Sequence, residues 1–215
     1  MNEVFVPPTQ KGRDRKDAIL AVASELFLAN GYSDVTLDDV IEKAGGSRVS
    51  IYKAFGGKQQ LFEAVIEAAC DDFESRLFAI QYSHLPFEAG FRHLAEIYIN
   101  MALDQQHLQF YRVVLGNASR FPNIGSIWYV RGVQAVSEVF FRFLSFHLKG
   151  EAIGPETLRT LSDSVQGSLV FCLLSAATVL QTPPTEQQKS AAIDSSARMA
   201  TLAYNALRSH EGQSD

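Results

Sequence analysis

Apolar residues recur at spacings of three and four along most of the chain, a period typical of amphipathic α-helices. Between residues 17 and 29 the positions that would share one helical face are all apolar, namely Ile19, Leu20, Ala23, Leu26 and Phe27. No segment of useful length alternates apolar and polar residues as a half-buried strand would, and no segment repeats. The pattern therefore predicts an all-α fold, with helices over residues 17–29, 36–44, 48–55, 58–80, 87–103, 105–120, 124–148, 156–180 and 185–208.

The stretch from Thr36 to Lys58 predicts two short helices joined by a glycine turn. Thr36 is a good N-cap residue, and Asp39 follows three positions later as in a capping box. Gly45-Gly46 can end this helix because glycine readily adopts the conformations that a helix stop needs, and Ser47 can cap the next helix. This order is typical of a helix-turn-helix, whose second helix enters the major groove of DNA.

The second of these helices, residues 48–55, has an outward face suited to DNA. Ile51 and Phe55 share the inward face. The other faces carry cations, a hydroxyl, a phenol and one methyl-rich side chain, the groups that contact phosphate oxygens, base edges and thymine methyls. The residues concerned are Arg48, Val49, Ser50, Tyr52 and Lys53.

Gly56-Gly57 ends this helix, and Lys58 opens the next one. A lysine at a helix N-terminus opposes the helix dipole, but it becomes favourable when an anion is bound there. We therefore interpret Lys58 as a phosphate contact, with a solvated surface lysine as the alternative. The run Lys11–Lys16 is interpreted either as an arm that reaches the minor groove or backbone, or as a solvated leader.

Residues 15–62 resemble the DNA-binding domain of the TetR (tetracycline-repressor-like) transcriptional regulators. The resemblance rests on Asn30-Gly31-Tyr32 at the end of the first helix, then VTLDDVIEKAGGS, SIYKAF and GGKQQLF, in that order. Tyr52 and Phe55 match the end of the family's recognition helix, whereas Lys53 replaces an aromatic residue and Ala54 replaces a histidine. The resemblance implies DNA contacts from Thr36, Ser47, Arg48, Val49, Tyr52 and Lys58.

The resemblance also predicts the domain organisation. We expect a flexible basic leader at residues 1–14, a three-helix helix-turn-helix domain at residues 15–60, and a helical bundle at residues 61–215 for ligand binding and dimerisation. The segment 165–180 is apolar on nearly all sides, and residues 191–207 are rich in alanine, so these helices should be buried against neighbours and another chain. The family implies a homodimer through the last two long helices, which suits a palindromic operator. A large monomeric core is the alternative.

A ligand site in the second domain is implied mainly by the family. The middle helices are rich in aromatic residues, which are typical of small-molecule cavities but also of plain core. We therefore expect an apolar or aromatic effector, and no metal or cofactor. The candidate ligand-binding residues are His93, Tyr98, Asn100, Phe110, Asn117, Trp128 and Phe171.

Composition agrees with a soluble, cytoplasmic regulator. Residues 1–60 contain eight Lys/Arg and eight Asp/Glu, so the net charge of −5 comes from the rest of the chain and does not argue against a local basic surface. Cys70 and Cys172 are far apart and form no metal-binding pair. We expect neither a signal peptide nor a membrane span, because the longest apolar stretch, residues 169–180, is too short to cross a bilayer.

These observations predict a DNA-binding regulator, a repressor that an effector releases by shifting the dimer to a conformation that no longer fits the operator. Two other classes of function stay open. An enzyme is one, although none of the histidines lies in a recognisable catalytic or metal-binding constellation. The other is a helical interaction module that has lost DNA binding, for which Ala54 is the only support.

Overall fold

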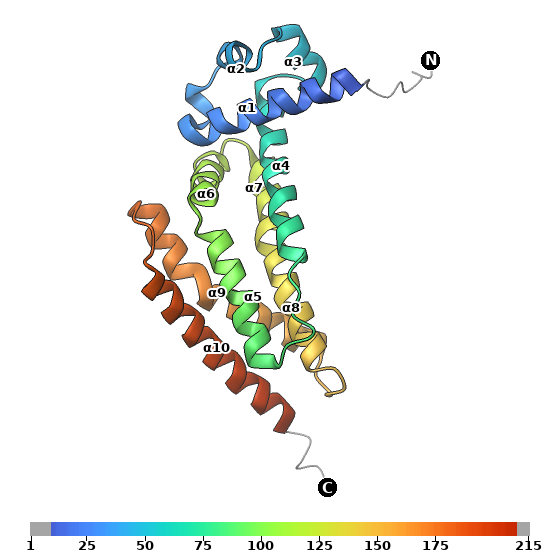
Figure 1. Cartoon of the computed structure of the whole chain (residues 1–215), viewed down its shortest axis with the longest axis vertical. Coiled ribbons are helices and arrows are strands. Elements are labelled where there is room, and N and C mark those ends of the chain that lie inside the picture. The colour runs from blue at the N-terminus through green and yellow to red at the C-terminus, as the bar shows by residue number, and fades with distance from the viewer. Residues whose placement is uncertain (1–9, 210–215) are drawn as a thin grey trace. The chain divides into compact units, whose positions relative to one another are not determined.

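The computed structural model describes residues 10–209, and this range folds into helices with no strand (Figure 1). The all-α prediction is therefore confirmed for the described residues. In chain order the elements are α1 (Gln10–Asp34), α2 (Leu37–Ala44), α3 (Arg48–Phe55), α4 (Lys58–Phe78), α5 (Phe87–Ala102), α6 (Gln105–Asn117), α7 (Pro122–Trp128), the π-helix η1 (Tyr129–Gln134), α8 (Ala135–His147), α9 (Pro155–Val179) and α10 (Glu186–Ser209).

Helix α1 begins earlier than the sequence pattern predicts. The expected leader covers residues 1–14, but residues 10–14 already belong to α1, and residues 1–9 lie outside the described range. The helix is interrupted near its end at Gly31, where φ is 78°. The backbone there needs glycine because a positive φ is costly for other residues.

The chain divides into two compact units. Within the described range, the first comprises residues 10–69 and 113–125, and the second comprises residues 70–112 and 126–209. The sequence places the division at residue 60 instead. Packing explains the difference, because α4 and the α6–α7 turn supply aromatic side chains to the core of the first unit.

That core is built around a cluster of four rings. Phe62 of α4 packs against Phe27 and Tyr32 of α1, with ring centroids 5.0 Å apart in both pairs. Phe121, between α6 and α7, meets the edge of Tyr32 at 4.6 Å. Aromatic pairs at such separations stabilise beyond their buried area, so residues distant in sequence tie α1 to α4 and to the α6–α7 turn.

Local hydrogen bonds fix the ends of α2 and α3 as the sequence predicts. The backbone N–H of Thr36 donates to Asp39 Oδ2 at 2.6 Å, and the N–H of Asp39 donates to Thr36 Oγ1 at 3.2 Å, which completes a capping box. Ser47 and Ser50 form the same reciprocal arrangement at the start of α3. Such caps satisfy backbone donors that a helix start leaves free.

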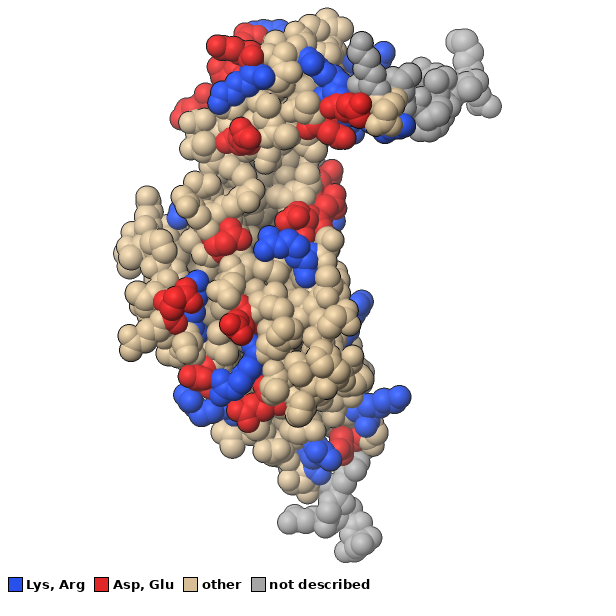
Figure 2. Space-filling view, viewed as in Figure 1, with Lys and Arg blue, Asp and Glu red and all other residues tan. Residues whose placement is uncertain are grey.

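The second unit is a bundle with a continuous apolar core. Helix α9 packs against α8 and α10, and α5 packs against both α9 and α10 (Figure 1). Phe91, Phe140 and Phe143 are fully buried at its centre. On the face of this unit visible in Figure 2, acidic and basic side chains lie side by side and leave broad uncharged areas between them.

One predicted helix is not uniform. The pattern predicts a single helix over residues 124–148, whereas the structure divides this region into α7, η1 and α8. The Gln166 side chain of α9 donates from Nε2 to the carbonyl of Val133 at 3.3 Å. Isolated π-helical turns occur frequently at functional sites, and this one borders the cavity described below.

Helix α9 is long and apolar enough, by length and composition, to cross a membrane, although the sequence analysis expects no span. This is weak support for a membrane helix, because core helices of soluble proteins pass the same test. Here α9 packs between α8 and α10 and buries Leu158, Val165 and Leu169.

Candidate DNA-binding surface and ligand cavity

Helix α3 presents a distinct outward face. Ile51 is buried beneath the helix, whereas the side chains of Val49 and Tyr52 are 75% and 57% exposed. Lys53 is exposed beside them. An exposed valine and tyrosine on a short helix lose favourable burial, and a base-reading role would account for them.

Arg48, at the start of α3, is already paired in the free protein. Its guanidinium binds the carboxylate of Asp38 in α2 through two hydrogen bonds, of which Nε to Oδ1 is 2.9 Å. The pair lowers the pKa of Asp38 and raises the pKa of Arg48, chiefly through these hydrogen bonds. Both side chains are 63% exposed, so the guanidinium is accessible although it is held in one orientation.

Lys58 lies at the start of α4, partly buried against α1. Its Nζ is 4.3 Å from the centre of the Tyr32 ring and donates to the carbonyl of Ser33 at 3.4 Å. Burial lowers the pKa of this amine, and the nearby charge of Arg120 acts in the same direction. These contacts fix the position of the amine and leave it free donors, since an ammonium group has three.

The three hydroxyl groups predicted to meet DNA also serve the helix caps. Thr36 Oγ1 donates to Asp39 Oδ2 at 2.8 Å, and Ser50 Oγ donates to the carbonyl of Ser47 at 2.6 Å. Ser47 Oγ accepts the N–H of Ser50 at 3.3 Å. Thr36 and Ser47 are exposed and Ser50 is partly buried. The caps therefore hold the hydroxyls of Thr36 and Ser47 at the exposed starts of the two helices.

The turn between α2 and α3 is tightly packed. Gly45 and Gly46 have φ values of 71° and 102°, which are unfavourable for other residues. The guanidinium of Arg15 lies against Gly46, where a Cβ would overlap it and approach Ser50 Oγ at 3.0 Å. Only glycine fits at Gly46 without a shift of Arg15.

A cavity of about 940 Å³ lies within the second unit. It is framed by α4, α5, α6, the end of α7, η1, α8 and α9. This volume is within the range of small-molecule sites. Eight of its lining residues are aromatic or histidine, namely Phe73, Phe78, Tyr98, His107, Tyr111, Trp128, Tyr129 and Phe171.

Three of the seven predicted ligand-binding residues line this cavity, namely Tyr98, Trp128 and Phe171. The other four lie elsewhere. His93 is exposed, Asn100 Oδ1 accepts from Lys189 Nζ at 3.3 Å, Phe110 is buried near His107, and Asn117 Nδ2 donates to the carbonyl of Val113 at 2.8 Å.

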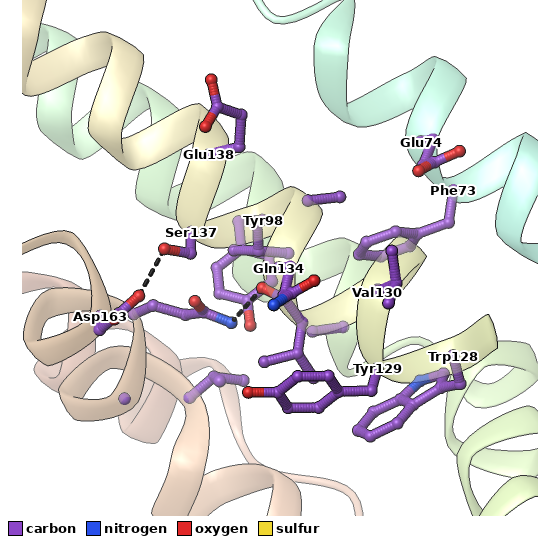
Figure 3. A pocket seen from close by; sticks show the side chains of 18 of the residues that line it. Phe73, Glu74, Tyr98, Trp128, Tyr129, Val130, Gln134, Ser137, Glu138 and Asp163 are labelled. Atoms are coloured by element: carbon purple, nitrogen blue, oxygen red, sulfur yellow. Dashed lines mark hydrogen bonds between the residues drawn. The ribbon is translucent and has the colours of Figure 1, made fainter. Parts of the chain in front are cut away.

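The polar lining comes mainly from α8 and α9, which the sequence analysis did not identify. Ser137 donates from Oγ to Asp163 Oδ1 (Figure 3). Glu138 accepts from Arg142 and from Arg159, each at 2.9 Å, and Glu74 binds Arg131. Polar side chains at these positions are typical of any helix surface, and the sequence carries no signal that a cavity lies beside them.

Burial controls the charge of the aromatic polar groups. His107 stacks on Phe73 with ring centroids 5.1 Å apart, and desolvation lowers its pKa to about 4. Desolvation also raises the pKa of Tyr98, and a hydrogen bond with Gln166 partly opposes this shift. At neutral pH both side chains are therefore uncharged, as suits an aromatic wall.

A second surface on this unit is apolar and uncovered. Several large apolar side chains on α9 and α10 face solvent, and Phe171 and Leu202 are 67% and 71% exposed. Uncovered apolar surface of this kind is typical of protein interfaces. The exposed residues are Phe171 and Val179 on α9, Leu180 directly after its end, and Met199 and Leu202 on α10, and Phe171 also lines the cavity. In the described residues no group of three or more His, Cys, Asp or Glu is arranged to hold a metal ion.

Comparison with known proteins gives two family matches. The model of the tetR family of bacterial regulatory proteins matches residues 19–65, and that of the AefR-like transcriptional repressor C-terminal domain matches residues 89–206. Both describe regulators rather than enzymes.

Curated relatives match the N-terminal part. The HTH-type transcriptional regulator SrpR of Pseudomonas putida is 38% identical over 56 residues, which cover 26% of this chain and 26% of the relative. The DNA-binding transcriptional repressor TetR of Mycobacteroides abscessus is 31% identical over 68 residues, which cover 32% and 36%. The chain thus matches about a quarter to a third of the length of these relatives.

Solved structures match nearly the whole chain. A TetR-family regulator from Mesorhizobium loti has a TM-score of 0.74 at 22% identity, over 93% of this chain and 98% of that one. The flavonoid-responsive regulator FrrA has a TM-score of 0.72 at 21% identity, over 89% and 97%. At these identities the likeness shows a shared fold.

Proposed function

The chain belongs to the TetR family of DNA-binding transcriptional regulators, and from this premise we propose that it is a cytoplasmic, effector-responsive repressor. It binds a palindromic operator as a homodimer, and a small apolar or aromatic molecule in the cavity releases it. The observation that carries this proposal is the pairing of an exposed α3 face in one unit with an aromatic cavity in the other.

DNA contacts are divided between two roles in this proposal. Lys58 and the hydroxyls of Thr36 and Ser47 lie at helix starts, where phosphate is favoured. Val49, Tyr52 and Lys53 project from the exposed face of α3 and are suited to base edges. Backbone contacts position the protein, and base contacts select the sequence.

Dimerisation through α9 and α10 would cover the exposed apolar side chains on these helices. A two-fold dimer presents the same patch from both copies, so a self-complementary apolar face suits it. The same symmetry places two α3 helices on the two halves of a palindrome.

Communication between the cavity and DNA follows from chain connectivity. Helices α4, α6 and α7 each contain residues of both units. The same three helices supply cavity residues, including Phe73, His107 and Trp128. An effector that prefers one arrangement of these helices shifts the population of dimers that fit the operator. The structural neighbour FrrA, by its name, responds to a flavonoid, which is an aromatic molecule.

DNA binding is tested with fluorescence anisotropy on the DNA upstream of the protein's own gene and on random DNA. Lys58→Ala should weaken binding to both DNAs alike and lower the salt slope by about one unit. Lys53→Ala should reduce the preference for the specific site. The control is Lys149→Ala, an exposed lysine of the second unit. A Lys58 variant that loses only specific binding contradicts the phosphate role.

The dimer is tested by measuring the mass of two variants by light scattering, each with an exposed leucine replaced by arginine. Leu202→Arg, on α10, should produce monomers at micromolar concentration, because a charge would be buried in the interface. Leu115→Arg, on α6, is the matched control and should leave the mass unchanged. A Leu202→Arg variant that remains dimeric excludes this interface.

A further inference from the structure

The carboxylates that line the cavity differ in whether they form ion pairs. The lining contains three carboxylates, Glu74, Glu138 and Asp163, and one guanidinium, Arg159. Glu74 pairs with Arg131, and Glu138 pairs with both Arg142 and Arg159. Among residues 10–209, no Lys, Arg or His forms an ion pair with Asp163. Asp163, an exposed residue at the edge of the cavity, therefore has no cationic partner among these residues.

A hydrogen bond holds the Asp163 carboxylate in place but leaves part of its capacity to accept hydrogen bonds unused. The buried Ser137 donates to Oδ1, which fixes the carboxylate relative to α8. Within the described part of the chain, Oδ2 has no hydrogen-bond partner. An ionised carboxylate accepts several hydrogen bonds, so Oδ2 is an acceptor that a ligand can use.

The one cation in the cavity lining, Arg159, is already paired with a carboxylate. The Arg159 guanidinium is engaged twice, because it binds Glu138 at 2.9 Å and lies 3.9 Å from the centre of the Phe141 ring. His107 is partly buried against Phe73 and uncharged at neutral pH. A ligand carboxylate placed beside Asp163 would bring two like charges together, which is costly.

Figure 3 shows Ser137 and Asp163 on the side of the cavity away from Trp128, Tyr129 and Phe73, with Tyr98 toward the first pair and Glu74 beside Phe73. The aromatic side favours flat rings that stack or meet edge to face. A ligand that spans both sides has an aromatic body and a polar end.

We propose that the ligand of this cavity is a planar aromatic molecule that donates a hydrogen bond from a hydroxyl or a protonated amine to Asp163, and that aromatic carboxylates are excluded. This inference rests on the proposed function and specifies its effector. Charge-assisted hydrogen bonds are among the strongest in proteins, so Asp163 selects for the donor while the aromatic wall supplies most of the contact area.

The test uses four flavones that differ at one position, which carries a hydroxyl, a methoxy, an aminomethyl or a carboxylate group. Affinity is measured by calorimetry on the full chain. Quenching of Trp128, the only tryptophan in the sequence and a lining residue, locates binding in the cavity. The hydroxyl and aminomethyl compounds should bind about 10-fold or more tightly than the methoxy compound. The carboxylate should bind most weakly.

Asp163→Asn should remove most of this preference and improve binding of the carboxylate. The control is Glu156→Gln, because this residue lies at the start of the same helix, is exposed, and is outside the lining. Glu156→Gln should leave the order of the four affinities unchanged. Melting curves of both variants check that the fold is retained.

Three results would overturn the inference. The first is a carboxylate that binds wild type as tightly as the hydroxyl compound, and the second is an Asp163→Asn variant that affects all four compounds alike. Either leaves an effector-responsive repressor intact. The third is that none of the four compounds binds, which overturns the ligand class without removing the cavity as a site for another apolar effector. If the order is as expected but the operator is not released, the ligand class stands and the proposed release mechanism fails.

Discussion

At the scale of single residues, the side chain of Arg48 is held in one orientation by a carboxylate of the neighbouring helix in the absence of DNA. The family resemblance implies that Arg48 contacts DNA, and the structure places its guanidinium on Asp38 of the neighbouring helix. The pair limits the conformations of a long side chain, so less entropy is lost when it meets a phosphate or a base. We therefore predict that Asp38 orients Arg48 for its proposed contact with DNA.

Replacing Asp38 with Asn should lower the ratio of specific to random DNA affinity several-fold, because Arg48 loses its fixed orientation. Affinity for random DNA should rise, since a negative charge is removed. Glu42→Gln removes the same charge from α2 at an exposed site with no ion pair among the described residues. Anisotropy titrations on both DNAs compare the two variants, and equal specificity ratios would rule out the positioning role.

His107 predicts how stability depends on pH. Burial lowers its pKa from 6.5 to about 4, so between these values the unfolded chain binds a proton that the folded chain does not. This residue's contribution to stability is therefore complete above about pH 6.5 and is lost as the pH falls to 4, by an amount on the order of 3 kcal/mol.

The measurement is urea unfolding between pH 7 and pH 4. His107→Phe keeps a ring on Phe73 and should flatten this part of the curve. His93→Gln, at an exposed position, should retain the wild-type dependence. An unchanged slope in His107→Phe would show that another group is responsible.

The sequence identifies the roles of some residues but not of others. Thr36, Asp39 and Ser47 were assigned correctly as cap residues because a cap depends on neighbours three positions away. Trp128 and Phe171 were found as cavity residues because aromatic side chains are conspicuous. Asp163 was missed, since nothing within its own helix distinguishes a carboxylate that faces a cavity from one that faces water.

At the scale of elements, the turn between α2 and α3 is the most constrained part of the DNA-binding unit. Gly46→Ala should destabilise the protein by about 1–2 kcal/mol, because a positive φ is costly with a Cβ and the Arg15 guanidinium must move. It should also weaken operator binding, since α3 shifts with the turn.

Gly116→Ala is the matched control. Gly116 lies within α6, its φ is not positive, and a Cβ there meets nothing within 4 Å. This substitution should stabilise the protein by about 0.5–1 kcal/mol through helix propensity and the unfolded state. Thermal melts of the two variants should shift in opposite directions, and a shift in the same direction would contradict the account of the turn.

The spacing of apolar residues also fails to predict irregularities within a helix. The spacing of apolar residues predicts one helix over residues 124–148, and the chain there is helical but contains the π-helix η1. The carbonyl of Val133 accepts Gln166, which lies 33 positions further along the chain. A partner that remote leaves no trace in the local pattern, so the sequence could predict the helix but not its irregularity.

At the scale of the whole molecule, effector release requires that ligand binding in one unit change DNA binding by the other, and the two units share three helices. The family and the all-α fold could be predicted from the sequence, because the helix-turn-helix is local and specific. The membership of residues 113–125 in the DNA-binding unit could not, because it depends on Phe121 meeting Tyr32 across the fold.

The central claim is that cavity ligand and operator oppose each other through this coupling. The most direct measurement is a pair of titrations, operator affinity with and without the saturating hydroxyflavone, and hydroxyflavone affinity with and without operator. The account predicts that both affinities fall by the same factor, about 5- to 150-fold, because coupling is reciprocal. A hydroxyflavone that quenches Trp128 while operator affinity stays unchanged would contradict it.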